Sequence, residues 1–282
     1  MQIIETVAAL RSALKHQSNT ALVPTMGNLH AGHLHLVALA KQQAACVVVS
    51  IFVNPLQFGA NEDLANYPRS LEADCEKLAA AGVDIVFAPS VIEMYPQFDG
   101  DQLNQTMTIT APDIANELCG ASRPGHFSGV ATVVGKLFNI VMPQLAVFGK
   151  KDFQQLHIIR ELVKQFNLPI TIIAGDTVRE SNGLAMSSRN SFLTADQKNT
   201  AAQLHQELNA IKLQIQHGNT DFNALTMLAS ERLQATGWLV DYISVRNSIS
   251  LAPAASQDQT LVILAAAKLG NTRLIDNVDL LR

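Results

Sequence analysis

Several residue classes are scarce in this chain, and each shortage excludes a class of protein. Positive charge is not in excess: the net charge is −4 and the pI is about 6.0, which argues against a nucleic-acid partner because such proteins carry a basic stripe. No apolar run reaches the roughly 18 residues that a membrane helix needs. The N-terminus lacks the basic region and apolar stretch of a signal peptide. We therefore expect no membrane association and no secretion.

Cysteine and aromatic residues are also rare. The 3 cysteines, Cys46, Cys75 and Cys119, lie far apart and form neither a disulfide framework nor a metal-binding pattern, so we expect a reducing, cytoplasmic compartment. Aromatic residues make up 5% of the chain although hydrophobic residues make up 48%. Small aliphatic side chains must therefore fill the core, as is typical of a buried parallel sheet covered by helices. A length of 282 residues predicts one large domain or two unequal domains.

Strand-like and helix-like segments alternate along the first 175 residues or so. The expected strands are residues 21–24, 46–53, 84–88, 145–148 and 169–174, and the expected helices are residues 34–44, 70–81, 130–141 and 152–166. Residues 103–110 form an additional extended segment outside this alternation. The alternation predicts βαβ units, right-handed crossovers and an open parallel sheet that binds ligands at the carboxyl ends of its strands.

The pattern changes after about residue 176. Thr194 and Gln197 form a capping box at the start of a helix that Gly218 ends, and a second helix follows at about residues 221–237. Strand-like runs at 241–246 and 260–266 come next. We therefore predict an α/β domain over residues 1–176 and a smaller α+β domain over residues 177–282.

The most informative segment, residues 21–34, predicts a buried strand that turns into a helix with His30 and His33 in its first turn. Backbone N–H groups and the positive end of the helix dipole favour an anion there. Gly32 leaves room for a nucleotide near the backbone. Two alternatives remain: a zinc site that includes His35, whose spacing fits poorly, and ordinary surface histidines.

Two further segments follow expected strands. Asn54 and Gln57 lie in a polar loop, where they either face a ligand or satisfy their own backbone. In Gly149-Lys-Lys-Asp-Phe-Gln-Gln155, Asp152 and Gln155 could form a capping-box-like pair. The two lysines, however, oppose the helix dipole, and a bound polyphosphate would relieve that conflict.

Two more polar segments are candidates for ligand binding. Met186-Ser-Ser-Arg-Asn190 places two hydroxyls and a guanidinium on the expected domain connector, where they could hold a diphosphate or form an ordinary solvated loop. Ser122-Arg-Pro-Gly-His-Phe127 concentrates a cation and an imidazole before an apolar helix, an arrangement suited to a carboxylate pocket.

These motifs together resemble the bacterial pantothenate synthetase family, within the superfamily of nucleotidyltransferases that carry His-x-Gly-His. The resemblance extends over essentially the whole chain. It includes residues 24–33, 52–58, 122–127, 149–155 and 186–190, Tyr67-Pro-Arg69, and Gly270-Asn-Thr-Arg-Leu-Ile-Asp-Asn277. It implies a Rossmann-like, doubly wound parallel sheet with a smaller C-terminal α+β lid domain, and a homodimer. It also implies that ATP, (R)-pantoate and β-alanine give pantothenate, AMP and diphosphate through an enzyme-bound pantoyl adenylate, with Mg²⁺ on the ATP phosphates.

The resemblance also implies roles for individual residues. His30, His33 and Lys151 are the catalytic candidates, with His33 as the proton donor. The ATP-binding candidates are Met26, Gly27, Asn28, Leu29, His30, Ala31, Gly32, His33, Gly149, Lys150, Lys151, Asp152, Val178, Met186, Ser187, Ser188 and Arg189. The candidates for binding pantoate and β-alanine are Asn54, Gln57, Arg123, His126 and Gln155. No protein ligand of the metal is identified, although Asp74 is the nearest candidate carboxylate by position.

The chain departs from the family pattern at Leu56, where methionine is common, and at Lys150, where glutamate or glutamine is common. Neither change removes a group that the chemistry needs. Two alternatives are weighed against this interpretation: a cytidylyl- or adenylyltransferase with the same motif, and a nucleotide-binding regulatory module without turnover. The first would need basic residues near a phosphorylated acceptor, and the second predicts that one of the cationic groups is missing.

Overall fold

The structure is a computed structural model that describes residues 1–59 and 70–282. The chain forms two compact units. One consists of Met1–Gly149 and Ile158–Gly175, and the other of Lys150–His157 and Asp176–Arg282. The short segment Lys150–His157, which follows the fifth strand, therefore belongs to the second unit.

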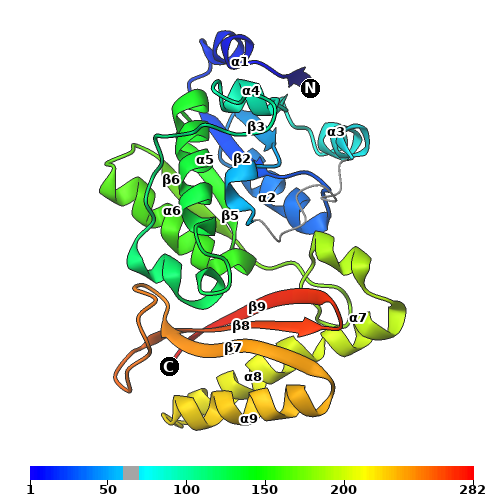
Figure 1. Cartoon of the computed structure of the whole chain (residues 1–282), viewed down its shortest axis with the longest axis vertical. Coiled ribbons are helices and arrows are strands. Elements are labelled where there is room, and N and C mark those ends of the chain that lie inside the picture. The colour runs from blue at the N-terminus through cyan, green and yellow to red at the C-terminus, as the bar shows by residue number, and fades with distance from the viewer. Residues whose placement is uncertain (60–69) are drawn as a thin grey trace. The chain divides into compact units, whose positions relative to one another are not determined.

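The first unit is built on a six-stranded parallel sheet with the order β1-β4-β3-β2-β5-β6 (Figure 1). Its strands are β1 (Gln2–Ile4), β2 (Thr20–Thr25), β3 (Cys46–Ile51), β4 (Ile85–Phe87), β5 (Leu145–Gly149) and β6 (Thr171–Gly175). The central strands are almost wholly buried, because helices cover both faces of a sheet of this kind.

The helices of this unit are α1 (Val7–Leu14), α2 (Ala31–Lys41), α3 (Leu71–Ala80), α4 (Val91–Met94), α5 (His126–Val141) and, from Ile158 onward, α6 (Phe153–Gln165). Buried side chains of α2 and α3 pack with those of β2, β3 and β5 in one apolar cluster, so these two helices cover the same face. Right-handed crossovers then place α1, α5 and α6 on the other face. The sheet is thus doubly wound, as predicted.

The five strands and four helices predicted in this part of the chain are all present, with ends that shift by a few residues. The largest shift is at α5, which begins at His126 and not at residue 130. The elements β1, α1 and α4 were not predicted. The extended segment at residues 103–110 belongs to no helix or strand; short 3-10 helices at Asp113–Asn116 and Leu118–Gly120 follow it.

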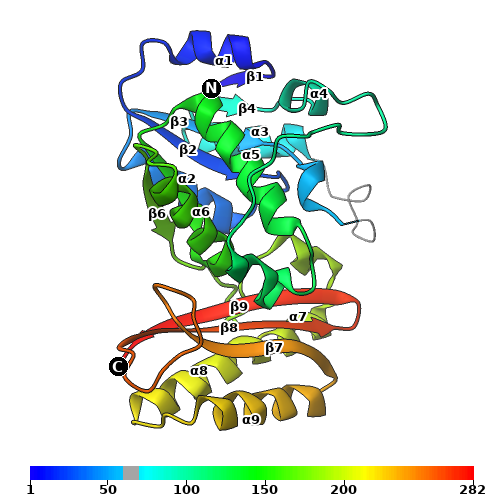
Figure 2. The same cartoon turned by 60° about the vertical axis from the view of Figure 1, so that its left-hand side comes forward.

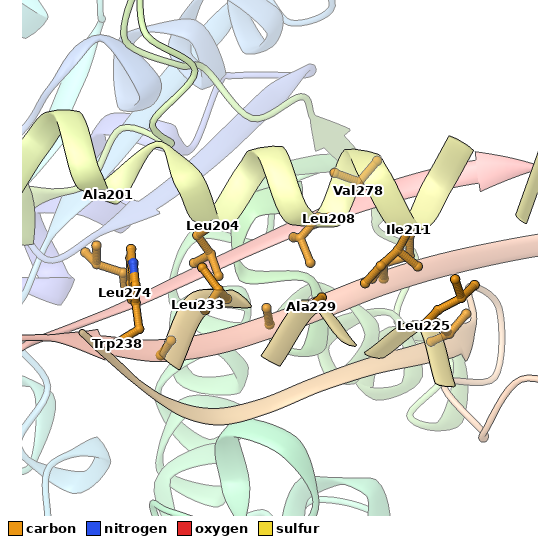
Figure 3. Close-up of a cluster of buried hydrophobic side chains, with 14 of the residues drawn as sticks. Ala201, Leu204, Leu208, Ile211, Leu225, Ala229, Leu233, Trp238, Leu274 and Val278 are labelled. Atoms are coloured by element: carbon orange, nitrogen blue, oxygen red, sulfur yellow. The ribbon is translucent and has the colours of Figure 1, made fainter. Parts of the chain in front are cut away.

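The second unit is an antiparallel sheet of β7 (Trp238–Asn247), β8 (Thr260–Leu269) and β9 (Thr272–Leu281), covered on one face by helices α8 (Gln203–Gln216) and α9 (Phe222–Ala235) (Figure 2). Their shared core includes Trp238, Leu208 and Leu233 (Figure 3). In β9 the core side chains are Leu274, Val278 and Leu280, so the even-numbered residues of this strand face the helices.

The capping box at Thr194 and Gln197 is confirmed, but the expected helix is divided into α7 (Ala195–Ala201) and α8 at Ala202. The α+β architecture is also confirmed. The sheet has a third strand, β9, that the sequence analysis did not predict, because Asp276 and Asn277 interrupt its apolar alternation. Among the described residues, no helix has both the length and the apolar character needed to span a bilayer. Cys46, Cys75 and Cys119, all within the described residues, form no disulfide bond.

Candidate active site

The predicted ligand-binding edge of the sheet is formed by loops that follow adjacent strands. β3, β2 and β5 are neighbours, and their carboxyl ends lead into the Asn54–Gln57 loop, the Met26–His30 turn and the Lys150–Asp152 turn, respectively. Parallel strands bring such loops to one edge of the sheet. The residues of each loop are held by specific contacts.

The turn after β2 is held by a buried carboxylate of α3. Asp74 is fully buried and accepts hydrogen bonds from the backbone N–H groups of Asn28 (2.7 Å) and Leu29 (2.8 Å). Ser70 also donates to it at 3.2 Å, and the Lys77 ammonium lies 3.7 Å away while donating to the Leu29 carbonyl at 2.8 Å. Both Asp74 oxygens are thus engaged by the turn, so the geometry makes Asp74 a support of the turn.

The backbone of this turn is left-handed at Gly27 (φ 83°) and Asn28 (φ 52°). A side chain at Gly27 would be strained at that φ, and its Cβ would meet Asp74 Oδ2 at 3.2 Å and Ile51 Cγ2 at 3.1 Å. Glycine therefore lets the turn lie against its supporting carboxylate.

His30 and His33 cap α2 with their own rings. His30 is the N-cap, and its Nδ1 accepts from the Gly32 N–H at 3.1 Å, while His33 Nδ1 accepts from the His30 N–H at 3.3 Å. The ring centroids are 4.1 Å apart. Because each Nδ1 accepts a hydrogen bond, each neutral imidazole carries its proton on Nε2. The turn thus holds two Nε2–H donors side by side at a helix N-terminus, where an anion is favoured.

The zinc alternative gains no support from this geometry. Both Nδ1 atoms are used for capping, and the residues that the structure describes contain no group of three or more His, Cys, Asp or Glu side chains that could hold a metal ion.

The loop after β3 is a buried amide network. Asn54 Nδ2 donates to Gln57 Oε1 and to the Gly129 carbonyl, both at 3.2 Å, and the buried Tyr95 hydroxyl donates to Asn54 Oδ1 at 2.6 Å. Gln57 Nε2 donates to the Met26 sulfur at 3.0 Å. Tyr95 thereby fixes which way the Asn54 amide points, and Asn54 in turn fixes Gln57. Burial raises the pKa of Tyr95, so its hydroxyl remains a donor.

The start of α5 holds the same loop from the other side. His126 Nδ1 donates to the Gln57 carbonyl at 2.8 Å, and Arg123 Nη1 donates to His126 Nε2 at 2.9 Å. Gly129 lies so close that a Cβ there would meet the Leu56 carbonyl oxygen at 2.3 Å and Gln57 N at 2.8 Å. Arg123 and His126 therefore brace the Gln57 loop. Their predicted role in carboxylate binding stays a prediction.

The turn after β5 is a 3-10 helix over Lys150–Asp152 that continues into α6. Asn277 of β9 donates from Nδ2 to the carbonyl oxygens of Lys150 and Lys151, each at 2.9 Å. The Lys150 ammonium lies 2.7 Å from Asp176 and 3.2 Å from Asp279, and these carboxylates raise its pKa although partial burial acts in the opposite direction. Carboxylates therefore already offset part of the conflict between the two lysines and the helix dipole.

Residues 178–189, which belong to the second unit, carry further candidates. The Met186 N–H donates to the Val178 carbonyl at 2.9 Å, and Arg179 forms an isolated bridge with Ala185, so the segment folds back on itself. Ser187 caps a 3-10 helix, Ser188–Phe192, by accepting from the Arg189 N–H at 3.2 Å. Ser187 and Ser188 are half-buried and Arg189 is exposed.

The other candidates are placed as follows. Gln155 lies in the first turn of α6 and is half-buried, Gly149 ends β5, and Ala31 and Gly32 begin α2. Tyr67-Pro-Arg69 lies outside the described residues. The parts played by Tyr95 and Asn277 were not predicted, because each side chain reaches its loop from an element that is distant in the sequence. The motif that ends in Asn277 was the available signal.

Comparisons with known proteins identify the family of this chain. The family model for pantoate-beta-alanine ligase matches residues 2–279 of the chain. The chain belongs to this family. It is 63% identical to the pantothenate synthetase of Methylobacillus flagellatus over 279 residues, which cover 99% of this chain and 98% of that protein. It is 56% identical to the pantothenate synthetase of Thiobacillus denitrificans, with 99% and 97% coverage.

Solved structures of the family confirm the fold. The pantothenate synthetase of Thermus thermophilus is 40% identical, with a TM-score of 0.92 and 99% coverage of both chains. The pantoate-beta-alanine ligase of Francisella tularensis, described as complexed with beta-gamma ATP and beta-alanine, is 34% identical, with a TM-score of 0.82 and coverage of 99% of this chain and 97% of that one. The Rossmann-like sheet with a smaller C-terminal domain is thus the family's architecture.

Proposed function

We propose that this ligase condenses (R)-pantoate with β-alanine at the expense of ATP, giving pantothenate, AMP and diphosphate through an enzyme-bound pantoyl adenylate. The observation that carries the proposal is the family match over residues 2–279, which contain the His30–His33 turn and its supporting contacts. Cytidylyl- and adenylyltransferases that share His-x-Gly-His are thereby set aside in favour of the ligase.

The first step makes the carboxylate reactive. A carboxylate oxygen of pantoate attacks the α-phosphorus of ATP, the bond to the β-phosphate oxygen breaks, and diphosphate leaves. Negative charge shifts to the diphosphate and to the equatorial oxygens of the α-phosphate. The protein therefore mainly has to position the two reactants and neutralise this charge. We assign the Nε2–H groups of His30 and His33 and the Lys151 ammonium to the phosphates, with Ser187, Ser188 and Arg189 on the departing diphosphate.

The second step forms the amide. The β-alanine amine attacks the acyl carbon of pantoyl adenylate, loses a proton, and AMP leaves. Gln57 and Gln155 are assigned to the pantoate hydroxyls and carboxylate, because neutral amides bind them without adding a nucleophile. Water must be kept from the adenylate. That residues 177–282 act as a lid for this purpose stays a prediction, as does the boundary after residue 176.

The remaining assignments follow the family. ATP contacts are proposed for Met26–His33, Gly149–Asp152, Val178 and Met186–Arg189, and contacts to pantoate or β-alanine for Asn54, Gln57, Arg123, His126 and Gln155. Mg²⁺ would be held through the ATP phosphates and water, a common arrangement for this ion, since Asp74 already gives both oxygens to the turn. Cysteines that form no disulfide suit a cytoplasmic enzyme. We also propose a homodimer.

The deciding assay uses the purified chain with Mg-ATP and pantoate, with and without β-alanine. We expect mass spectrometry to detect pantoyl adenylate when β-alanine is absent, and pantothenate and AMP to appear in equal amounts when it is added. Release of diphosphate with a phosphorylated acceptor, without any dependence on β-alanine, would instead establish a nucleotidyltransferase. Binding of ATP with no turnover at all would leave only a regulatory module.

A further inference from the structure

We propose that Asn277 is a positioning residue for catalysis, which fixes the Lys150–Lys151 turn through its side-chain amide. The inference rests on the proposed function, in which Lys151 contacts the ATP phosphates. It starts from the motif Gly270–Asn277, which the assigned chemistry leaves without a role. Asn277 is 6% exposed, and its one amide nitrogen donates to two consecutive carbonyl oxygens at 2.9 Å each.

The chemistry of the contact requires a primary amide. The Lys150 and Lys151 carbonyl oxygens can only accept hydrogen bonds, and the two N–H bonds of an asparagine amide supply one donor to each. Aspartate has the same shape but would place carboxylate oxygens against carbonyl oxygens. The Asn277→Asp substitution therefore changes the contact from attraction to repulsion with little change in volume.

The register of β9 explains why this residue reaches the turn. Its even-numbered residues Leu274 and Val278 pack in the core with α8 and α9 (Figure 3). Leu280 belongs to the same core, so odd-numbered residues project from the opposite face. Asn277 and Asp279 are neighbours on that face. Asn277 binds the backbone of the turn, and Asp279 binds the Lys150 ammonium at 3.2 Å. Two neighbouring side chains of β9, Asn277 and Asp279, thus bind the backbone of the turn and the Lys150 side chain, respectively.

Asn277 is itself held by an ion pair on the other face of the strand. Asp276, which is 4% exposed, accepts from Arg179 at 2.7 Å and 2.9 Å, and its Oδ1 also accepts from the Asn277 N–H at 2.7 Å. Arg179 Nη2 further donates to the Asn277 carbonyl at 3.4 Å. Because the N–H and the carbonyl of Asn277 both take part in hydrogen bonds, its backbone is held in place and its side-chain amide is positioned at the turn.

Lys150 and Lys151 are therefore placed differently. The Lys150 side chain is committed to Asp176 and Asp279, whereas the position of Lys151 depends on the backbone that Asn277 holds. A phosphate contact must be placed to within a fraction of an ångström, and a misplacement of about 1 Å can cost on the order of 100-fold in rate. Loss of the Asn277 amide should thus reduce adenylate formation beyond any loss of stability.

The test measures single-turnover formation of pantoyl adenylate at saturating pantoate, together with the melting temperature, in the full-length protein. We expect Asn277→Ala and Asn277→Asp to slow adenylate formation roughly 10- to 100-fold. Asn277→Ser keeps one hydrogen-bond donor and replaces either variant if that variant fails to fold. Its rate of adenylate formation should fall by less. The matched control is Val278→Ala, the next residue of β9, which loses core packing on the other face. It should lower the melting temperature while its rate stays within about twofold of the unmodified protein.

A double-mutant cycle with Lys151→Ala separates positioning from a general structural effect. If Asn277 acts through Lys151, the Asn277→Ala substitution should slow a Lys151→Ala background by less than about twofold. If the fold losses in rate of the two single variants multiply in the double variant, the inference is overturned. A normal rate in Asn277→Ala would also overturn it, as would a rate in Val278→Ala that falls in step with its stability. Failure of the unmodified protein to form adenylate would refute the proposed function itself. An unchanged rate in Lys151→Ala would refute the role of Lys151 and, with it, this inference.

Discussion

The turns after β2 and β5 are built on opposite hydrogen-bonding plans. The Met26–His30 turn directs two N–H groups inward, and a buried carboxylate from α3, Asp74, accepts from both. The Lys150–Asp152 turn directs two carbonyl groups inward, and a buried amide from β9, Asn277, donates to both. Each turn obtains its partner from a distant part of the chain. The groups that a turn leaves unsatisfied thus determine the chemistry of its support.

The two supports also differ in charge. Asp74 is fully buried, and its charge is balanced by backbone N–H groups, Ser70 and the nearby Lys77 ammonium. Asn277 is neutral. Removing a buried acceptor leaves its donors without partners, which costs more than the net value of the hydrogen bonds. The first turn should therefore be the more sensitive to loss of its support.

The largest expected effect comes from the chemistry that the first turn presents. His33→Ala removes one Nε2–H donor and should slow adenylate formation roughly 10²- to 10⁴-fold. It also removes the acceptor for the His30 N–H, so the free energy of unfolding should fall by about 1 kcal/mol. Single-turnover diphosphate release and urea unfolding measure the two effects.

His35→Ala is the matched control for that prediction, since His35 lies in the same helix two residues further on and outside the capping box. Its rate should be close to that of the unmodified protein. Equal losses in the two variants would mean that the helix start as a whole, and not the His33 donor, limits the reaction.

Breaking the support of the first turn should have the next largest effect. Asp74→Ala leaves the Asn28 and Leu29 N–H groups without their acceptor and should lower the free energy of unfolding by about 3 kcal/mol, as urea unfolding would measure. Glu76→Ala, on an exposed position of the same helix, should change it by less than about 0.5 kcal/mol. A smaller loss for Asp74→Ala than for Asn277→Ala would reverse the order that the comparison predicts.

A more modest effect is expected from the second turn. Lys151→Ala should weaken the use of ATP about 10-fold or more, whereas the melting temperature should stay the same or rise, because a lysine before a helix opposes its dipole. Lys164→Ala, in the last turn of α6, is the control of opposite sign. It removes a favourable charge, so it should lower the melting temperature and leave the KM for ATP unchanged. A marked fall in the melting temperature of Lys151→Ala would favour a purely structural lysine.

The smallest expected effect on stability concerns His205, which lies beside the Arg179–Asp276 ion pair. Burial and the Arg179 charge lower the pKa of His205, although Asp276, at 3.6 Å, acts in the opposite direction. Below about pH 6.5 the unfolded chain therefore binds a proton that the folded chain resists, and the free energy of unfolding falls as the pH falls. His205→Gln should flatten this decline below about pH 6.5.

Urea unfolding at several pH values tests that sign. His217→Gln, at the exposed end of the same helix, is the control and should leave the decline unchanged. A steeper decline in His205→Gln would mean that the folded protein stabilises the charged ring, and the sign above would be wrong.

Much of the fold could be predicted from the sequence because continuous apolar strands and capping signals are local. The strands at 46–53 and 145–148 and the capping box at Thr194 are examples. β9 was missed because Asp276 and Asn277 interrupt its alternation. β1 was missed because three residues, two of them exposed, give too short a pattern. Local pattern is thus a good guide to buried elements and a poor one to elements that carry polar function.

The candidate site divides along the same line. His30, Gln57 and Lys151 lie in loops that the sequence places at strand ends, and the family motifs name them. Tyr95, Asp74 and Asn277 support those loops from other elements. Their roles depend on which of several distant side chains reaches an unsatisfied polar group of the loop, and only the folded chain decides that.

The lack of a side chain at Gly129 determines how closely α5 approaches the Asn54–Gln57 loop. With no side chain there, the backbone of α5 rests directly on the carbonyl of Leu56, and the Gly129 carbonyl receives the Asn54 amide. A single methyl group added at Gly129 would clash with the backbone of Leu56 and Gln57 and would push that loop away from α5. The position of Gln57, which we propose binds pantoate, is thereby set by a helix that carries no side chain at one position. Variation in acid selectivity among related enzymes should be sought there as well as among the amides.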